Sequence, residues 1–139
     1  MSEARTSSDE IRRLIELPRD EFTDLVARLY RALGHQAVCT YAKDANGVHV
    51  IVHAANGQKW IVQCRQWRGA VGEAVVLDFI ETMRREQAAQ GAIITTAKFT
   101  PRARDCIKGK PLHLYDGDEF VKAMQRIRNR KQPADTRSA

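Results

Sequence analysis

The sequence predicts a single α/β domain in which a mixed β-sheet is covered by helices on both faces. Its 139 residues correspond to one domain, because domains commonly contain roughly 100–200 residues. Three successive strand-like segments followed by alternating helices and strands indicate a mixed sheet. The strand segments are almost continuously apolar, which is typical of strands buried on both faces. With 43% hydrophobic residues, the chain can form its own core without disulfides.

Two helices are predicted at the beginning of the chain. Ser7 or Ser8 can cap a first, short helix, because a serine side chain accepts a hydrogen bond from the free amides of the first turn. Pro18 favours the start of a new helix, and Gly34 supplies the left-handed residue that ends it. Between them, apolar residues recur at helical spacing and form one stripe: Phe22, Leu25, Val26, Leu29, Tyr30 and Leu33.

Three strands follow, at residues 36–42, 48–54 and 60–65. Each is rich in residues that favour a pleated surface. The segment Ala55-Asn56-Gly57 is a tight hairpin connection between the second strand and the third.

Helices and strands alternate in the second half. We expect a helix between Gly72 and Gly91, a strand at 92–96, a helix at 100–107, a strand at 111–115 and a last helix from Asp116 to Ile127. The predicted order is therefore ααβββαβαβα.

Three parts of the chain are distinguished. We expect residues 1–16 to form an N-terminal helical extension, residues 17–128 the main domain and residues 129–139 a disordered basic tail. After Asn129 the sequence turns to a mixture of Pro, Ser, Thr and Asp without apolar periodicity, and chain ends of this composition are commonly disordered.

The positive charge is unevenly distributed. The net charge is +6, and the surplus comes from residues 59–110 and residues 122–139, which each carry five more basic than acidic side chains. This asymmetry predicts an anion-binding face, with nucleic acid as the first candidate partner and an anionic membrane surface as the second.

Membrane insertion and export are not expected. The longest uninterrupted apolar run is the four residues 74–77, and the first 21 residues are polar and charged; we expect a cytoplasmic protein. Cys39, Cys64 and Cys106 form no CxxC pair, so neither a disulfide framework nor a zinc site is expected, and the three are interpreted as buried thiols.

Several short runs, in this order, resemble the catalytic domain of Mrr-type restriction endonucleases, a branch of the PD-(D/E)XK nuclease superfamily. The resemblance extends from about Leu17 to Met124. The runs that carry it are Phe22-Thr23-Asp24-Leu25-Val26-Ala27-Arg28-Leu29, Leu33-Gly34-His35, Gly47-Val48-His49-Val50-Ile51-Val52, Val62-Gln63-Cys64-Arg65-Gln66-Trp67, Ala92-Ile93-Ile94-Thr95-Thr96, Phe99-Thr100, Ala103 and Leu114-Tyr115-Asp116-Gly117. It implies a restriction-endonuclease-like fold with a Mg²⁺-dependent nuclease site.

At the site that the resemblance implies, this sequence departs from the family pattern. An aspartate that helps to hold Mg²⁺ is expected where His49 stands, and a lysine that neutralises the scissile phosphate where Arg65 stands. Thr23 occupies the position of a helix acid, and only Gln63 keeps its family identity. Neutral imidazole is a poor Mg²⁺ ligand, and an arginine does not exchange its proton with water at neutral pH. We therefore expect no cofactor and an inactivated nuclease site that still binds the phosphates of duplex DNA.

The basic and aromatic residues near this site are candidates for nucleic-acid binding. Trp67 can stack on a base or a sugar, and the other candidates can contact phosphates. Each also has an ordinary interpretation, because surface bases often form ion pairs or a solvated helix face. The set is Arg65, Gln66, Trp67, Arg68, Lys98, Arg102, Arg104, Lys108, Lys110, Arg130 and Lys131.

Two alternatives remain open. Relocated carboxylates, Asp44 and Glu73 foremost, can rebuild a Mg²⁺ site and make the chain an active endonuclease. The domain can also be a protein-interaction subunit of a larger defence, repair or recombination complex, or form a homodimer, as relatives with this fold often do.

Overall fold

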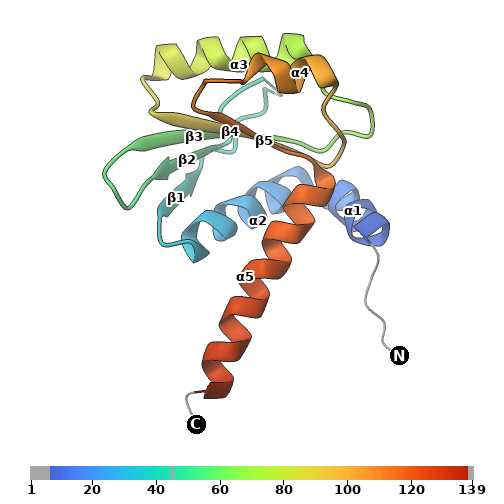
Figure 1. The fold of residues 1–139 in the computed structure, drawn as a ribbon, viewed down its shortest axis with the longest axis vertical. Coiled ribbons are helices and arrows are strands. Elements are labelled where there is room, and N and C mark those ends of the chain that lie inside the picture. The colour runs from blue at the N-terminus through green and yellow to red at the C-terminus, as the bar shows by residue number, and fades with distance from the viewer. Residues whose placement is uncertain (1–6, 45, 138–139) are drawn as a thin grey trace.

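The structure is a computed structural model that describes residues 7–44 and 46–137. The helices and strands follow the predicted order ααβββαβαβα (Figure 1). Their bounds are α1 Ser7–Glu16, α2 Arg19–Ala32, β1 Gln36–Cys39, β2 Val50–His53, β3 Lys59–Arg65, α3 Glu73–Glu86, β4 Gln90–Thr95, α4 Pro101–Cys106, β5 Leu112–Tyr115 and α5 Gly117–Arg137.

The five strands form one mixed sheet in the order β1-β2-β3-β4-β5. The first three pair antiparallel, with Val50 opposite Val62, and β4 and β5 run parallel to β3, with Arg65 opposite Thr95. The carboxyl ends of β3, β4 and β5 therefore lie along the same edge of the sheet, which we call the carboxyl edge. Because β2 is antiparallel to β3, the residues before β2 lie at this edge as well.

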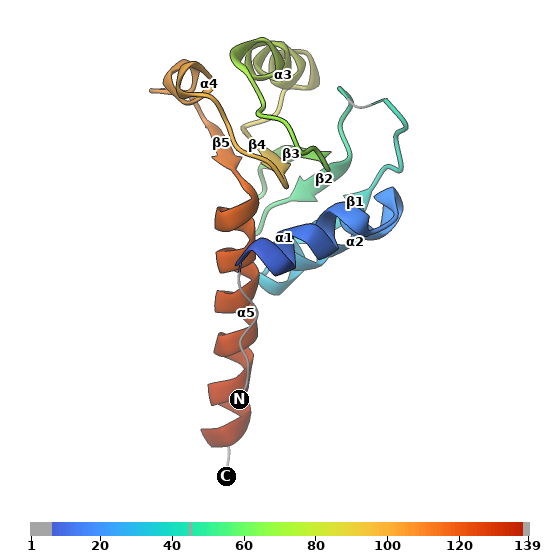
Figure 2. The same cartoon turned by 90° about the vertical axis from the view of Figure 1, so that its right-hand side faces the viewer.

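Helices cover both faces of the sheet, as predicted. Figures 1 and 2 show α3 and α4 on one face and α1, α2 and α5 on the other. Neighbouring residues of one strand point to opposite faces: Val62 belongs to the core under α2 and α5, whereas Ile61 belongs to the core under α3 and α4. This double burial explains why the strands are apolar throughout.

The strands are shorter than predicted at the carboxyl edge. β1 ends at Cys39, since Tyr41 has a left-handed backbone with φ 56°, and such a residue cannot continue a strand. β2 begins at Val50, so His49 stands immediately before it. The amide of His49 nevertheless donates to the Val62 carbonyl at 2.9 Å, which holds its backbone against β3.

The last helix is longer than predicted. It was expected to end near Ile127, but α5 continues to Arg137 and projects beyond the sheet (Figure 2). Residues 126–131 contain no Gly or Pro and are mostly Arg and Lys, which favour helix, so nothing local stops it there. The division into extension, domain and tail stays a prediction.

The three cysteines are free thiols of intermediate exposure, so they are less buried than expected. None of the helices within the described ranges is both long and apolar enough to cross a membrane.

Gly117 lets the start of α5 lie directly against the end of β4. A Cβ atom at this position would stand 2.7 Å from the Thr96 carbonyl oxygen and 3.0 Å from the Ile11 side chain. We expect Gly117→Ala to lower the free energy of unfolding by about 1–3 kcal/mol, because the backbone must shift to accept the methyl group. Urea denaturation measures this. Gly69→Ala is the control, since nothing lies within 4 Å of the corresponding methyl, and an equal loss in both variants would contradict the argument.

Candidate functional site

A polar pocket of about 240 Å³ opens at the carboxyl edge, and we call it the edge pocket. The first turns of α2 form one wall, the end of β3 and the residues after it form another, and the residue before β2 completes it. Its lining residues are Arg19, Phe22, Thr23, His49, Cys64, Arg65, Gln66 and Trp67. The structure thus brings together Thr23, His49 and Arg65, the three positions at which the sequence departs from the family pattern.

His49 is 4% exposed, and both of its ring nitrogens are engaged. Its Nδ1 accepts a hydrogen bond from the Cys64 amide at 2.9 Å, so its Nε2 must carry the proton and donates to the Asp44 carbonyl, also at 2.9 Å. Burial lowers the pKa of the imidazole, the Asp44 carbonyl opposes this, and the positive charge of Arg19 lowers it further. His49 is therefore a neutral imidazole at pH 7, with no free nitrogen to bind a metal ion.

Arg65 is a buried cation, 3% exposed, whose partners are neutral. Its Nε donates to Gln63 Oε1 at 2.7 Å, its Nη2 donates to Asn46 Oδ1, and the guanidinium lies 4.3 Å from the ring centre of Trp67. Within the described ranges, no ion pair joins it to a carboxylate. Burial lowers the pKa of the guanidinium and the charges of Asp44 and Asp78 raise it, but an arginine remains charged in proteins. A buried charge without a counterion is costly, so this pocket favours an anion.

Gln63 positions Arg65. It is 1% exposed, and its Nε2 donates to the Gly47 carbonyl at 3.4 Å while its Oε1 accepts from Arg65. The side-chain amide therefore fixes the direction of the guanidinium.

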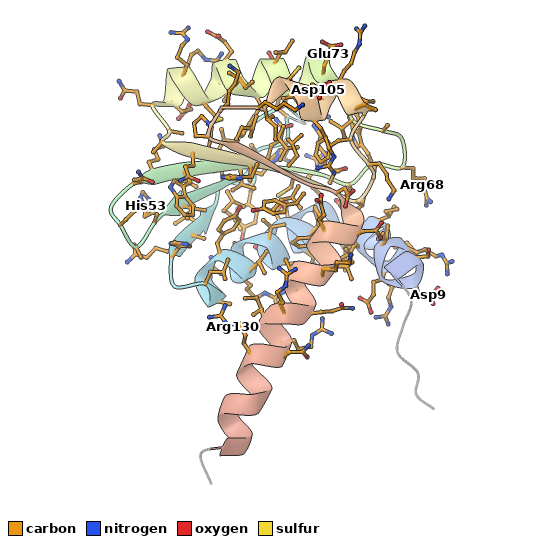
Figure 3. The ribbon with its side chains drawn as sticks, viewed as in Figure 1. Asp9, His53, Arg68, Glu73, Asp105 and Arg130 are labelled. Atoms are coloured by element: carbon orange, nitrogen blue, oxygen red, sulfur yellow. The ribbon has the colours of Figure 1, made fainter. Side chains whose placement is uncertain are left out.

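The residues after β3 have different roles. Gln66 donates to the carbonyls of Leu14 and Leu17, each at 2.9 Å, and so ties this segment to the junction of α1 and α2. Trp67 is 37% exposed and lies beneath the Arg65 guanidinium. Arg68 extends outward at the end of the sheet opposite His53 (Figure 3). Of these three, Trp67 and Arg68 are open to a ligand.

The predicted bases around α4 are mostly neutralised by carboxylates. Lys98 pairs with Asp118 at 2.9 Å, Arg102 with Glu73 at 3.2 Å, Lys108 with Asp105 at 3.3 Å, and Arg104 with Asp116 and Glu119 at 3.2 and 3.1 Å. Lys110 is the member of this group without such a pair among the residues that the structure describes. Four of the five bases thus have the ordinary role that the sequence also allowed.

The bases of the last helix lie away from the edge pocket. Arg130, on α5, is far from Arg68 in Figure 3, and the side chain of Lys131 lies outside the described residues.

Among the residues of the site that were not predicted, Arg19 and Asn46 carry its polar contacts. Arg19, at the start of α2, lines the edge pocket and donates to the Lys43 carbonyl at 2.9 Å. Asn46 holds Arg65 from the loop before His49. No local pattern marks either residue, because both reach the pocket only through the way α2 and this loop pack on the sheet.

Similarity to known proteins agrees with the fold described above. A sequence model of the restriction endonuclease family Mrr_cat matches residues 14–124. The fold is similar to the DNA modification-dependent restriction endonuclease AspBHI, with 15% identity and a TM-score of 0.68 over 89% of this chain and 36% of that one. It is also similar to the MspJI restriction endonuclease in complex with a 27-mer oligonucleotide, with 18% identity and a TM-score of 0.62 over 91% of this chain and 35% of that one. A third similar structure is EndoMS in a complex with dsDNA, with 14% identity and a TM-score of 0.52 over 84% of this chain and 46% of that one. No curated protein matches the chain significantly.

The fold is that of a restriction-endonuclease-like domain. The chain belongs to the Mrr_cat restriction endonuclease family, since the family model matches most of its length. The resemblance to Mrr-type endonucleases seen in the sequence is therefore confirmed. The chain spans between about a third and half of the length of the structures named above.

The residues of the edge pocket do not fit the Mg²⁺ ion that the family implies. Mg²⁺ requires oxygen ligands in octahedral geometry, whereas His49 offers no free atom and the Gln63 oxygen already accepts from Arg65. Asp44 accepts from the Asn46 amide, and Glu73 pairs with Arg102. In the part of the chain that is described, no three His, Cys, Asp or Glu side chains gather closely enough to hold a metal ion.

The burial of His49 predicts a pH dependence of stability. Its pKa in the folded protein is lowered from the ordinary value of about 6.5, so below that pH the unfolded chain binds a proton that the folded chain does not. The free energy of unfolding should therefore fall as the pH drops below about 6.5, by up to about 1.4 kcal/mol per pH unit, and His49→Gln should lack this fall. Urea denaturation between pH 7.5 and pH 5 tests this, with the exposed His53→Gln as control. A similar pH profile in His49→Gln and the unaltered protein would contradict it.

Proposed function

We propose that this domain binds duplex DNA through the edge pocket and that its metal-dependent nuclease centre is inactive. The observation that carries the proposal is Arg65, a buried guanidinium held by amide oxygens beside a neutral His49, without a carboxylate partner in the described part of the chain. The centre lacks the charge pattern of a Mg²⁺ site and has that of an anion site.

A phosphate group suits this arrangement. Gln63 and Asn46 occupy donors on Nε and Nη2 of Arg65, and the remaining N–H donors of Nη1 and Nη2 can bind two phosphate oxygens. Arginine is favoured wherever such recognition occurs. Arg19 and Arg68 add positive charge around the pocket, and the exposed part of Trp67 can stack on a sugar or a base. MspJI and EndoMS, whose folds are similar, were solved with an oligonucleotide and with dsDNA, which supports DNA as the source of the phosphate.

The basic residues on and beside α4 contribute less to the proposed DNA contact than the residues of the edge pocket. Lys98, Arg102, Arg104 and Lys108 can contact phosphates only by exchanging a carboxylate for them, whereas Lys110 and Arg68 need no such exchange. The proposed interface is therefore centred on Arg19, Arg65 and Arg68.

Salt titration tests DNA binding. The affinity for a duplex of arbitrary sequence should fall steeply as salt rises, because each neutralised phosphate releases counterions and contributes about −0.9 to the slope of log K against log salt. Fluorescence anisotropy with a labelled duplex measures the slope. An affinity that stays constant from about 50 to 200 mM salt would refute binding through phosphates.

A plasmid-nicking assay with Mg²⁺ or Mn²⁺ tests the loss of catalysis. Asp44 is the residue that favours the second candidate, an active endonuclease with relocated ligands, since its charge reaches both His49 and Arg65. We expect intact plasmid. Nicking that chelation stops and that Asp44→Ala abolishes would establish the endonuclease instead.

A further inference from the structure

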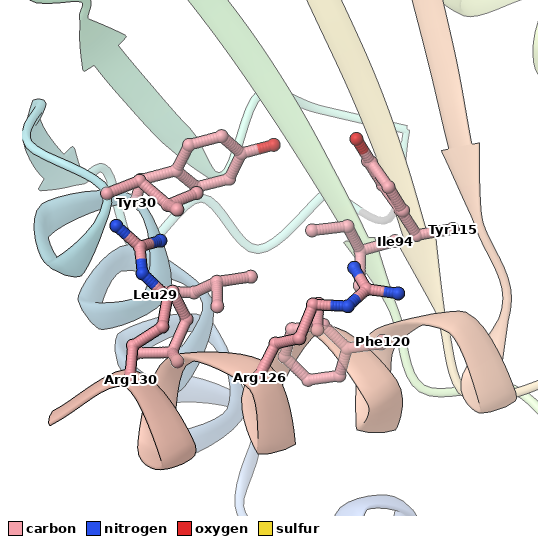
Figure 4. A pocket seen from close by; sticks show the side chains of 10 residues that line it. Leu29, Tyr30, Ile94, Tyr115, Phe120, Arg126 and Arg130 are labelled. Carbon is pink, nitrogen blue, oxygen red and sulfur yellow. The ribbon is translucent and has the colours of Figure 1, made fainter. Parts of the chain in front are cut away.

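A second pocket, of about 270 Å³, lies between α2, α5 and the ends of β4 and β5 (Figure 4). We call it the helix pocket. It shares no lining residue with the edge pocket, so the proposed DNA site does not account for it. Its walls are largely apolar, formed chiefly by Leu29, Leu33, Ile94, Phe120, Ala123 and Ile127.

Two tyrosine hydroxyls enter this apolar space without a partner. Tyr30 is 9% exposed, and neither its hydroxyl nor that of Tyr115 forms a hydrogen bond with any residue that the structure describes. In Figure 4 the two hydroxyls approach each other from opposite walls of the pocket. Because no fully enclosed polar atom in the described ranges lacks a partner, the Tyr30 oxygen must reach the open space of the pocket.

Both phenols are hydrogen-bond donors at neutral pH. Burial raises the pKa of Tyr30 and of Tyr115, so both keep their protons. A buried hydroxyl usually has a hydrogen-bond partner, and the helix pocket has space for one to enter from outside.

Two arginines contribute positive charge to the same pocket. Arg126 and Arg130 stand one turn apart on α5 and both line the helix pocket; in Figure 4 the Arg126 side chain lies below Tyr115 and the Arg130 side chain lies below Tyr30, beside Leu29. Neither forms an ion pair with a carboxylate in the described residues. Arginine can only donate hydrogen bonds, so the polar groups of the helix pocket together offer donors and positive charge beside hydrocarbon walls.

We propose that the helix pocket binds a small carboxylate with an apolar body, either an aromatic ring or a short alkyl chain. The body lies against the side chains of α2 and α5, and the carboxylate oxygens accept hydrogen bonds from the Tyr30 and Tyr115 hydroxyls and from Arg126 or Arg130. A volume of about 270 Å³ lies just below the usual range of about 300–1,000 Å³ for ligand pockets, which restricts the ligand to molecules of the size of benzoate or hexanoate.

The experiment titrates the full chain with benzoate and with hexanoate by isothermal titration calorimetry. Two further probes separate the two halves of the proposed ligand: benzyl alcohol has the ring without the charge, and inorganic phosphate has a charge without the apolar body. We expect both carboxylates to bind with a 1:1 stoichiometry and the two partial probes to bind at least tenfold more weakly. Equal binding of benzyl alcohol or of phosphate would overturn the proposal.

Variants locate the site. Tyr30→Phe keeps the ring and removes only the donor, and it should weaken benzoate binding about tenfold, the cost of one hydrogen bond to a charged group. The double variant Arg126→Gln, Arg130→Gln should weaken it at least as much. The controls are Tyr41→Phe, an exposed tyrosine bonded to Asp24, and Arg128→Gln, which lies on α5 but does not line the helix pocket. Unchanged affinity in the test variants, or equal losses in the controls, would refute the site.

Sedimentation at increasing protein concentration tests for the other possible occupant, a second copy of this chain. A monomer at the concentrations at which benzoate binds supports the proposal. Self-association that abolishes the benzoate response would show that the pocket is a contact between copies, and the proposal would be wrong.

Discussion

Replacing Arg65 by methionine is expected to weaken the binding of duplex DNA by about ten- to a hundredfold, because it removes a charge-assisted contact worth about 1.5–3 kcal/mol. Methionine keeps much of the length and the apolar stem of arginine, so it can fill the space above Trp67. It also removes a buried cation that has no carboxylate partner within the described ranges, and the loss of such a charge is often tolerated by the fold. Fluorescence anisotropy measures the affinity, and the slope of log K against log salt should become less steep by about 0.9.

Lys59→Met is the matched control. It removes the same charge from the same strand, but Lys59 stands at the opposite end of β3 and pairs with Glu86 at 3.2 Å. Its DNA affinity should stay within about twofold of the unaltered protein, since a single exposed ion pair contributes little. Equal losses in the two variants would indicate a general effect of net charge and would remove Arg65 from the interface.

Arg65→Lys distinguishes a guanidinium contact from a simple positive charge. Lysine keeps the charge but presents a point charge without the planar set of donors, and it cannot reach Gln63 and Asn46 in the same way. We expect an affinity between those of the unaltered protein and Arg65→Met, with the salt slope preserved. An affinity equal to that of the unaltered protein would show that charge alone is recognised.

The proximity of His49 and Arg65 could be predicted because it depends on the pairing of strands. The apolar runs around His49 and Arg65 define two strands, and the resemblance to the family identifies which position in each faces the site. Once β2 and β3 pair antiparallel, with Val50 opposite Val62, His49 must stand near the end of β3. The hydrogen bonds between β2 and β3 therefore bring two residues that are distant in the sequence to the same pocket.

Most of the ion pairs around α4 could not be predicted, since all of their acids except Asp105 come from other elements. The sequence around Lys98 and Arg104 contains a single acid, Asp105, which suggested a surplus of positive charge. In the fold, Glu73 lies at the start of α3 and pairs with Arg102. Asp116, Asp118 and Glu119 lie at the start of α5 and pair with Arg104 or Lys98. Charge counted along the sequence overestimates the charge on a surface wherever helix beginnings, which favour acids, meet a basic segment.

The helix pocket could not be predicted from the sequence for a similar reason. Tyr30 appears in the sequence as one member of the apolar stripe of the second helix, and Arg130 appears as a candidate phosphate contact or a solvated base. Only the packing of α5 across α2 brings the hydroxyl and the two guanidinium groups to one space. The spacing of residues along one helix predicts which face is buried, but not which polar groups of two helices meet.

Phe120→Ala is expected to lower the free energy of unfolding by about 3–5 kcal/mol, the usual cost of truncating a fully buried phenylalanine. Phe120 of α5 and Phe22 of α2 are each 1% exposed, and their rings meet edge to face with centroids 5.7 Å apart. This pair is a main contact between the two helices, so a cavity there loosens α5 as well as removing apolar contacts. A domain of this kind is stable by only about 5–15 kcal/mol, so the variant should unfold at a much lower urea concentration.

The two rings also join the two pockets, since Phe22 lines the edge pocket and Phe120 lines the helix pocket. The exposed Leu77, on α3, provides the control: Leu77→Ala should change the stability by no more than about 0.5 kcal/mol. A Phe120→Ala variant as stable as Leu77→Ala would show that α5 is not held by this contact. If the loss is as large as expected, benzoate affinity should fall with it even in conditions where the variant is folded, because Phe120 is part of the wall against which the apolar body of the ligand lies.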